Sequence, residues 1–310
     1  MRVGRVVAAA LVALGLASTP AFAWDEVGHR VVARIAWDHM TPAARAAAVR
    51  LLSNAPANSG ILGLVGPDVP GADRGRELFV MAAYWPDIIR SRGTLGYPYA
   101  HSDWHYVNFF WAQQTPGGPV VDERGRTDGQ LLNQLPRLAA TLADATASDS
   151  ARSVALAWIL HLVGDAHQPL HNSARITPQD PQGDRGGNLF LLGGIYPRNN
   201  LHGYWDALVG LSEPWTVSDR NEGGYIGRIS ARLARRYTPS WARSRLLPGR
   251  FEEWSREGVR IAQTTAYPVW LARGQPAPAR YLPYAWGAAQ PRITLAGYRL
   301  ADVLNRGLAP

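Results

Sequence analysis

The sequence of 310 residues contains no cysteine and no lysine. Without cysteine there can be no disulfide bond and no thiolate metal ligand, so stability must come from core packing and from metals held by other side chains. All 32 basic residues are therefore arginine, against 24 acidic residues, and the formal charge is +8. Guanidinium groups pair with phosphate and stack on bases, which suits a polyanionic partner, although many exported proteins are basic without binding one.

The sequence also lacks long apolar runs, except near its start. Two arginines precede an apolar run over residues 6–16, and Ala21-Phe22-Ala23 has the small-x-small pattern of a cleavage site. We predict a signal peptide over residues 1–23, removed before Trp24. A membrane anchor is disfavoured because the run is shorter than the roughly 20 residues that span a bilayer. We expect export to the periplasm or the medium, with no membrane association after cleavage.

Helical periodicity dominates the remaining chain, residues 24–310, which we expect to form one mostly α-helical domain. Gly-, Pro- and Asn-rich connections over 53–75, 91–126 and 172–201 show little strand alternation and are long enough to build a site. The predicted helices cover residues 31–40, 42–52, 76–90, 130–146, 150–168, 205–210, 218–236, 251–274 and 292–305.

Histidine and aspartate recur at spacings that suit metal binding. His161 and Asp165 lie four residues apart on an apolar helix, so both side chains project from one face. One such pair is more often a hydrogen-bonded core pair than a metal site. Several together favour a metal cluster, because imidazole and carboxylate are the usual non-thiolate ligands of zinc. The further groups are His171 after Pro169, His202 with Asp206, Asp87 with His105, and Trp24 with His29.

These residues resemble the S1/P1-type zinc nucleases of the phospholipase C/nuclease superfamily, and the missing cysteines suggest a bacterial branch. The resemblance spans residues 24–310 and implies three zinc ions in a helical fold. The motifs that carry it are Trp24-x4-His29, Trp85-Pro86-Asp87, His105-Tyr106, His161-x3-Asp165-x5-His171, the Gly-Gly-Asn at 186–188, His202-x3-Asp206 and Leu295-Ala-Gly-Tyr-Arg-Leu-Ala. The implied ligands are Asp87, His105, His161 and Asp165 for the first ion, His171, His202 and Asp206 for the second, and Trp24 (amino nitrogen and carbonyl oxygen), His29 and Asp165 for the third.

The resemblance further implies an endonuclease that cleaves single-stranded DNA and RNA to 5′-phosphorylated products and acts on 3′-mononucleotides. A hydroxide held between two zincs would attack phosphorus, so no side-chain base is required. Catalysis would involve Asp87, Asp165 and Arg90. Arg90 matches a phosphate-contacting position and is equally well a solvated helix-end arginine. Tyr106 would stack on a base, or be a structural tyrosine.

Some residues depart from the family pattern. Asn108 stands where several relatives have a base-binding aspartate, and Asp25 replaces the usual glycine after the first tryptophan. The alternatives are a phospholipase C of the same superfamily, or a non-catalytic exported protein that binds zinc or nucleic acid. No obligate protein partner is implied.

Overall fold

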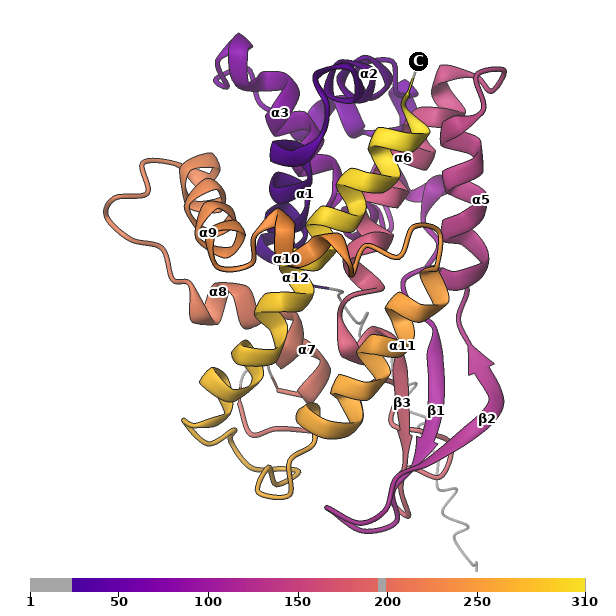
Figure 1. Cartoon of the computed structure of the whole chain (residues 1–310), viewed down its shortest axis with the longest axis vertical. Coiled ribbons are helices and arrows are strands. Elements are labelled where there is room, and N and C mark those ends of the chain that lie inside the picture. The colour runs from indigo at the N-terminus through magenta and orange to yellow at the C-terminus, as the bar shows by residue number, and fades with distance from the viewer. Residues whose placement is uncertain (1–23, 195–198, 310) are drawn as a thin grey trace, which may run out of the picture.

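The computed structural model describes residues 24–194 and 199–309, so the predicted signal peptide over residues 1–23 lies outside the described residues. Figure 1 shows a body of helices with a small sheet at its lower right. In the described part of the chain, no helix has the length and apolarity needed to cross a bilayer. The main helices are α1 (Glu26–His39), α2 (Pro42–Ser53), α3 (Gly71–Ala82), α4 (Trp85–Ile88), α5 (Leu131–Ala143), α6 (Asp149–Asp165), α7 (Leu201–Asp206), α8 (Leu208–Ser212), α9 (Glu222–Arg236), α10 (Pro239–Arg243), α11 (Phe251–Ile261) and α12 (Tyr281–Gly307).

Helix α6 forms the centre of the core. Ser148 caps its first turn by accepting a hydrogen bond from the backbone N–H of Ala151, and nearly every residue from Ser153 to Asp165 is buried. A helix that is apolar all round must be surrounded by other elements. Helix α6 is indeed surrounded, because it contacts α1, α2, α3, α4, α5 and α12. The predicted helix over 150–168 is therefore confirmed, with its end at Asp165.

Helices α1 and α12 cross at close range, and a glycine permits the approach. A Cβ atom at Gly297 would lie 2.5 Å from Cγ2 of Ile35 and 3.1 Å from the carbonyl oxygen of Val32. This glycine belongs to the motif over residues 295–301. Helix α12 begins at Tyr281, earlier than predicted, and continues through Pro291.

The predicted helix over 76–90 is two helices, because Pro86 has no N–H to continue the backbone ladder. The turn at Ala83–Tyr84 leaves the carbonyl oxygen of Ala83 to accept a hydrogen bond from Nδ1 of His161 at 2.8 Å. The break thus contributes directly to the site.

The expectation that residues 91–126 and 172–201 lack strands is wrong. They contribute to a three-stranded sheet of order β2-β1-β3, in which β1 (Asn108–Ala112) pairs antiparallel with β2 (Val121–Asp128) and parallel with β3 (Ser173–Ile176). All five residues of β1 are buried, so its sequence does not alternate. Strand β2 is an exposed, charged edge strand whose sequence resembles a loop.

Short elements complete the connections. The 3-10 helices are η1 (Ala57–Ser59), η2 (Ile61–Leu64), η3 (Tyr97–Tyr99) and η4 (Pro169–His171), and a π-helical turn, η5 (Ala262–Ala266), follows α11. Of these, η4 matters most for the site, because it turns the chain immediately after α6.

Candidate metal centre

Five predicted ligands converge on one buried cluster, although they come from four separate segments. His161 and Asp165 project from α6, with 3.3 Å between Nε2 and Oδ2. Nδ1 of His105 lies 3.4 Å from Oδ2 of Asp165 and 3.8 Å from Oδ1 of Asp87, which α4 supplies. Nε2 of His29, from α1, lies 3.3 Å from Oδ1 of Asp165. All five side chains are buried.

Three more predicted ligands form a second cluster at the end of α6. Nε2 of His202 lies 3.5 Å from Oδ2 of Asp206, one turn along α7, and Nε2 of His171 lies 3.8 Å from Oδ1 of the same aspartate. The turn through η4 brings His171 to this place. The ligand atoms of these three residues all lie within 4.8 Å of one another, which is close enough for a shared ion.

Hydrogen bonds orient the histidine rings of the second cluster so that both Nε2 atoms point to one place. Nδ1 of His171 faces the carbonyl oxygen of His105 at 2.8 Å, and Nδ1 of His202 faces that of Gly186 at 2.7 Å. A carbonyl oxygen can only accept, so each Nδ1 carries the proton and each neutral ring has its lone pair on Nε2. The two Nε2 atoms lie 3.0 Å apart. A shared proton or a metal ion between the two atoms would make this contact favourable, and with a carboxylate oxygen of Asp206 beside each ring the three residues fit a metal ion.

The first cluster fits metal ions for a related reason: its buried polar atoms lack enough hydrogen-bond partners. In the described part of the chain, neither carboxylate oxygen of Asp165 nor either ring nitrogen of His29 has a hydrogen-bond partner. Each such buried group costs about 1–3 kcal/mol unless another interaction satisfies it. Metal coordination would satisfy both oxygens of Asp165 and one ring nitrogen of His29.

Asp165 is placed to serve two ions. Its Oδ1 atom faces His29, whereas its Oδ2 atom faces His105 and His161. The ring of His29 stacks on that of His161 at 3.9 Å, so the first and third predicted ligand groups form one continuous cluster. A glycine permits this approach, because a Cβ atom at Gly164 would lie 2.7 Å from Nδ1 of His29.

Trp24 lies beside both clusters. Its side chain is fully buried, and Cδ1 of its indole ring lies 3.8 Å from the position of a Cβ atom at Gly164. The next residue, Asp25, donates its backbone N–H to the carbonyl oxygen of Asp206 at 3.0 Å and accepts from the N–H of Gly28, which caps α1. The start of the described chain is therefore anchored at the centre.

Burial shifts the pKa values of these groups toward their neutral forms. It raises the pKa of Asp87 to about 6 and that of Asp165 and Asp206 well above the usual range. It lowers the pKa of His161 to about 3 and that of His29 and His105 well below 6.5. In the absence of a metal, burial therefore favours the protonated form of the carboxyl groups, and it favours the neutral form of the histidines that metal ligation needs.

Two polar side chains beside the ligands were not predicted. Gln168 is fully buried and donates from Nε2 to Oδ1 of Asp206 at 2.6 Å, while its Oε1 accepts from the N–H of Leu170. Asn172 donates to the carbonyl oxygens of Asp165, Ala166 and Gln168 at the end of α6. Their positions, Gln168 between Asp165 and His171 and Asn172 directly after His171, were the only sequence signal.

A buried charge network supports the same helix end from the other side. Arg292 of α12 donates to the carbonyl oxygens of Ala166 and His167, and Arg299 donates to Nε2 of His167 at 2.9 Å. Glu257 of α11 pairs with both arginines. The network holds α6, α11 and α12 together next to Asp165.

The predicted substrate residues lie around the first cluster. NH1 of Arg90 contacts Oδ1 of Asp87 at 3.2 Å and its side chain is only 10% exposed, so it is not a solvated helix-end arginine. Tyr106 is half-buried and packs over Gly129, where a Cβ atom would lie 2.7 Å from the ring. Asn108 is buried at the start of β1.

The other described histidines lie away from the ligand clusters. His39 bonds to the carbonyl oxygen of Ile35, and His101 stacks on Trp104 at 3.8 Å. His167 lies two residues beyond Asp165, so its side chain points another way, toward Arg299.

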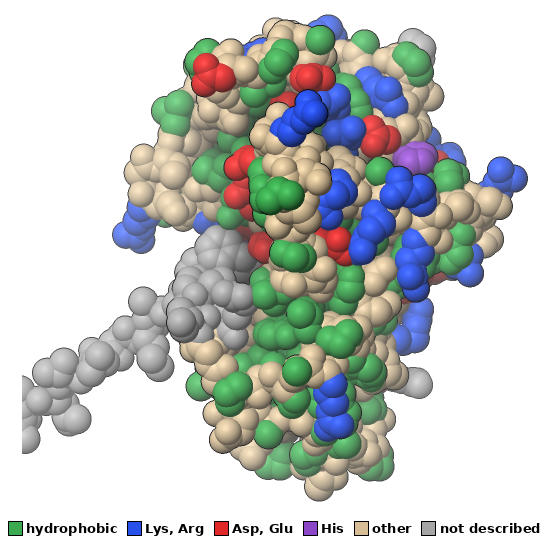
Figure 2. Space-filling model, turned by 90° about the vertical axis from the view of Figure 1, so that its left-hand side faces the viewer, with side chains coloured by type: hydrophobic (Ala, Val, Ile, Leu, Met, Phe, Trp, Pro, Cys, Tyr) green, Lys and Arg blue, Asp and Glu red, His purple; other side chains and the backbone are tan. Residues whose placement is uncertain are grey.

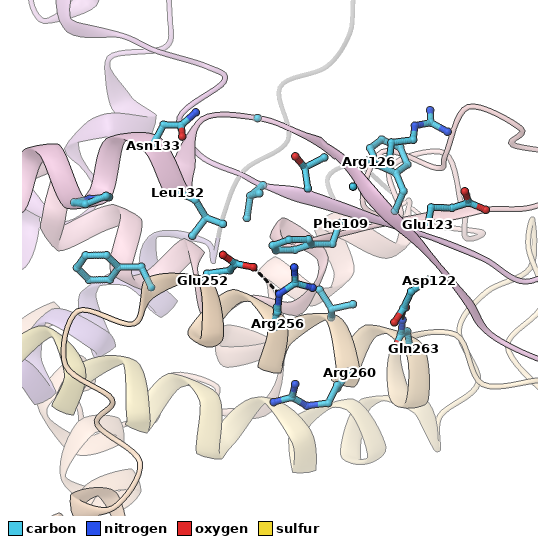
Figure 3. Close-up of a pocket in the computed structure, with 18 of the residues that line it drawn as sticks. Phe109, Asp122, Glu123, Arg126, Leu132, Asn133, Glu252, Arg256, Arg260 and Gln263 are labelled. Carbon is cyan, nitrogen blue, oxygen red and sulfur yellow. Dashed lines mark hydrogen bonds and ion pairs between the residues drawn. The ribbon is translucent and has the colours of Figure 1, made fainter.

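A groove of about 970 Å³ lies between the sheet, α5 and α11. Figure 3 shows Arg256 of α11 beside Phe109 of β1, with Arg126 on β2 and Arg260 further along α11. The guanidinium of Arg256 lies 4.3 Å from the ring centre of Phe109 and bonds to Glu252, and that of Arg126 lies 4.0 Å from Phe110. Gly129, which packs against Tyr106, also lines this groove, so the groove begins beside the predicted base-binding tyrosine.

A helical fold with two buried His/Asp clusters defines a candidate metal-dependent hydrolase. Residues 24–309 match the S1/P1 Nuclease family, and the chain belongs to it. The chain is 25% identical to "Endonuclease 3" of Arabidopsis thaliana over 301 residues, which is 92% of this chain and 89% of the plant protein. It is 27% identical to "Endonuclease 5" of the same plant over 159 residues, about half of each chain. The protein is thus a nuclease, a hydrolase of phosphodiester bonds.

Proposed function

We propose that this protein is an exported zinc-dependent endonuclease that cleaves single-stranded DNA and RNA to 5′-phosphorylated products and also acts on 3′-mononucleotides. The observation that carries the zinc assignment is the convergence of His171, His202 and Asp206, whose ligand atoms lie within 4.8 Å of one another while both Nδ1 atoms are bonded to carbonyl oxygens. Asp165 has one oxygen toward His29 and the other toward His161, and this supports two more ions, which would share this carboxylate.

Bound zinc would supply a Lewis acid and lower the pKa of a coordinated water. The chain's own residues would orient the substrate. Tyr106 offers a half-exposed ring on which a base can stack, at roughly 1–3 kcal/mol per base. A single strand exposes its bases for such stacking, whereas a duplex does not, and this favours single-stranded substrates. Arg90 would contact the phosphate beside Asp87.

The same proposal includes removal of residues 1–23. Trp24 can bind zinc through its nitrogen only as a free amine, because an amide nitrogen has no available lone pair. The burial of Trp24 and the bond from Asp25 to Asp206 support a role for this residue at the centre. A precursor that retains residues 1–23 would therefore be nearly inactive.

The test is metal analysis of the purified mature protein together with assays on single-stranded DNA, RNA, 3′-mononucleotides and phosphatidylcholine micelles. We expect about three zincs per chain and hydrolysis of the nucleic acids. Hydrolysis of phosphatidylcholine alone would assign a phospholipase C instead. Zinc binding without hydrolysis of any of these substrates would leave only a binding protein.

A further inference from the structure

The positive charge of the protein is concentrated in one segment. Residues 24–310 contain 30 arginines and 24 acidic residues, a formal charge of +6. Residues 222–250, which form α9, α10 and the loop before α11, contain seven arginines and one glutamate, also +6. The rest of residues 24–310 is balanced, with 23 of each sign. Figure 2, which views the side where α9 lies, shows arginine side chains gathered on one half of the molecule.

Within this segment, two arginines flank a pair of aromatic rings. The guanidinium of Arg236 lies 5.6 Å from the ring centre of Tyr237, the rings of Tyr237 and Trp241 lie 5.0 Å apart, and the guanidinium of Arg245 lies 4.9 Å from the ring of Trp241. Both arginines are exposed and both rings are half-buried. Stacking holds the planar groups in place, so little conformational freedom remains to be lost on binding.

Most acidic side chains near this row are already neutralised. Within the described residues, Arg228 and Arg232 pair with Glu213, and Arg250 pairs with Glu253. The side-chain contacts of Arg236 and Arg245 are instead with rings, hydroxyls and a carbonyl oxygen. Arg235 and Arg243 add two exposed cations at the ends of α9 and α10. We call Arg235, Arg236, Tyr237, Trp241, Arg243 and Arg245 the arginine–aromatic surface.

This surface is separate from the metal centre. It lies on the outer side of α12, which α10 contacts, and the carbonyl oxygen of Arg245 accepts from Arg299 at 2.6 Å. Arg299 in turn reaches inward to His167, near the end of α6. Helix α12 therefore lies between the surface and the clusters, and Figure 1 shows α10 on the viewer's side of α12.

The groove of Figure 3 has one end beside Tyr106 and another near the chain that leads from Arg245 into α11. It begins at Gly129, which packs against Tyr106, and its wall includes Gly249 and Phe251, close in the chain to Arg245. Arg126, Arg256 and Arg260 also line it. A strand that leaves the metal centre beside Tyr106 would therefore meet arginines along the groove before it reaches the arginine–aromatic surface.

We propose that the arginine–aromatic surface binds single-stranded nucleic acid at a distance from the metal centre and so retains long substrates between cleavage events. Guanidinium groups bind phosphate bidentately, and their planes together with aromatic rings offer stacking positions for unpaired bases. An anionic membrane is a poorer partner, because Trp241 packs against the cluster of Ala242, Leu295 and Tyr298 and does not present an exposed apolar face.

The experiment uses the mature zinc-loaded protein and two triple variants with the same change of net charge. The test variant is R236Q/R243Q/R245Q, and the control is R50Q/R137Q/R306Q, three exposed arginines on α2, α5 and the end of α12. Each protein is assayed on a thymidine dinucleotide and on oligothymidylate of about 40 nucleotides, longer than one binding site covers. Sedimentation with phosphatidylglycerol vesicles is measured in parallel.

We expect the test variant to have an about tenfold higher KM for the long strand. The slope of log KM against the logarithm of the salt concentration should fall by roughly 2, because three phosphate contacts are lost. Hydrolysis of the dinucleotide should be unchanged in every variant. R236K/R243K/R245K should keep the salt slope but bind the long strand more weakly, since lysine does not stack as arginine does.

Three outcomes would overturn the proposal. If the test variant has the same KM and salt slope as the wild type, the surface does not bind the strand. If the control variant loses as much as the test variant, the effect is one of net charge alone. Loss of vesicle binding with an unchanged KM would assign the surface to lipid. If the wild-type protein cleaves no nucleic acid, the proposed function fails, and anisotropy of a labelled oligothymidylate then tests the surface alone.

Discussion

The role of Gln168 leads to a measurable prediction about metal affinity. This side chain is fully buried, and its Nε2 donates to Oδ1 of Asp206 at 2.6 Å. Replacement by methionine keeps the length and removes the donor. A hydrogen bond to a charged group contributes about 1.5–3 kcal/mol, which corresponds to roughly 10- to 100-fold in affinity. We therefore expect Gln168→Met to weaken binding of one zinc by about that factor, the usual range for groups that orient metal ligands.

The assay is competitive zinc titration with a chromogenic chelator, combined with urea unfolding. The control is Gln113→Met, which removes another buried glutamine whose Nε2 donates to the carbonyl oxygen of Gly118 beyond the end of β1. Both variants should lose stability, but only Gln168→Met should lose zinc affinity. Equal zinc affinity in the two variants would refute an orienting role for Gln168.

The remaining predictions concern residues of the centre. Asp165→Asn should nearly abolish activity and reduce the zinc content, whereas His167→Ala should lower stability by roughly 2–4 kcal/mol and keep the zinc content; loss of zinc from both would contradict the opposite directions of these side chains. Tyr106→Ala should weaken binding of single strands much more than hydrolysis of a small chromogenic diester, and equal losses would indicate a structural tyrosine. A mature form with one glycine added before Trp24 should bind about one zinc fewer and should be roughly 100-fold slower. An unchanged zinc content would exclude the amine of Trp24 as a ligand. Zinc affinity should fall as the pH drops below about 6, because burial raises the pKa of Asp87 to about 6 and zinc must then displace a proton; a flat profile from pH 7 to 5 would contradict this.

Short spacings predict two of the candidate ligand pairs, whereas the full ligand set is what the family resemblance implies. His161 with Asp165, and His202 with Asp206, lie one helical turn apart, so the choice of face follows from local geometry alone. The structure brings these pairs together with the other predicted ligands, and the family match is independent of that geometry.

Features that depend on contacts between distant segments were not predictable. Arg292 supports the end of α6 from more than a hundred residues away, and nothing in its local sequence indicates that contact. Strand β1 was missed because burial on both faces removes the alternation that identifies a strand. The early start of α12 was missed because Pro291 indicated a helix boundary, although the helix continues through it.

The distribution of the ligands along the chain has a consequence for biosynthesis. Every predicted ligand lies between Trp24 and Asp206, whereas Glu257, Arg292 and Arg299, which support the end of α6, all come later. A chain emerging N-terminus first would present the complete set of ligands about 50 residues before Glu257 and about 90 before Arg299. These supporting side chains arrive only with α11 and α12, the last two α-helices of the described chain. Its final geometry is therefore expected to form after translation is almost complete, and a chain truncated before α11 should bind metal weakly despite containing every ligand.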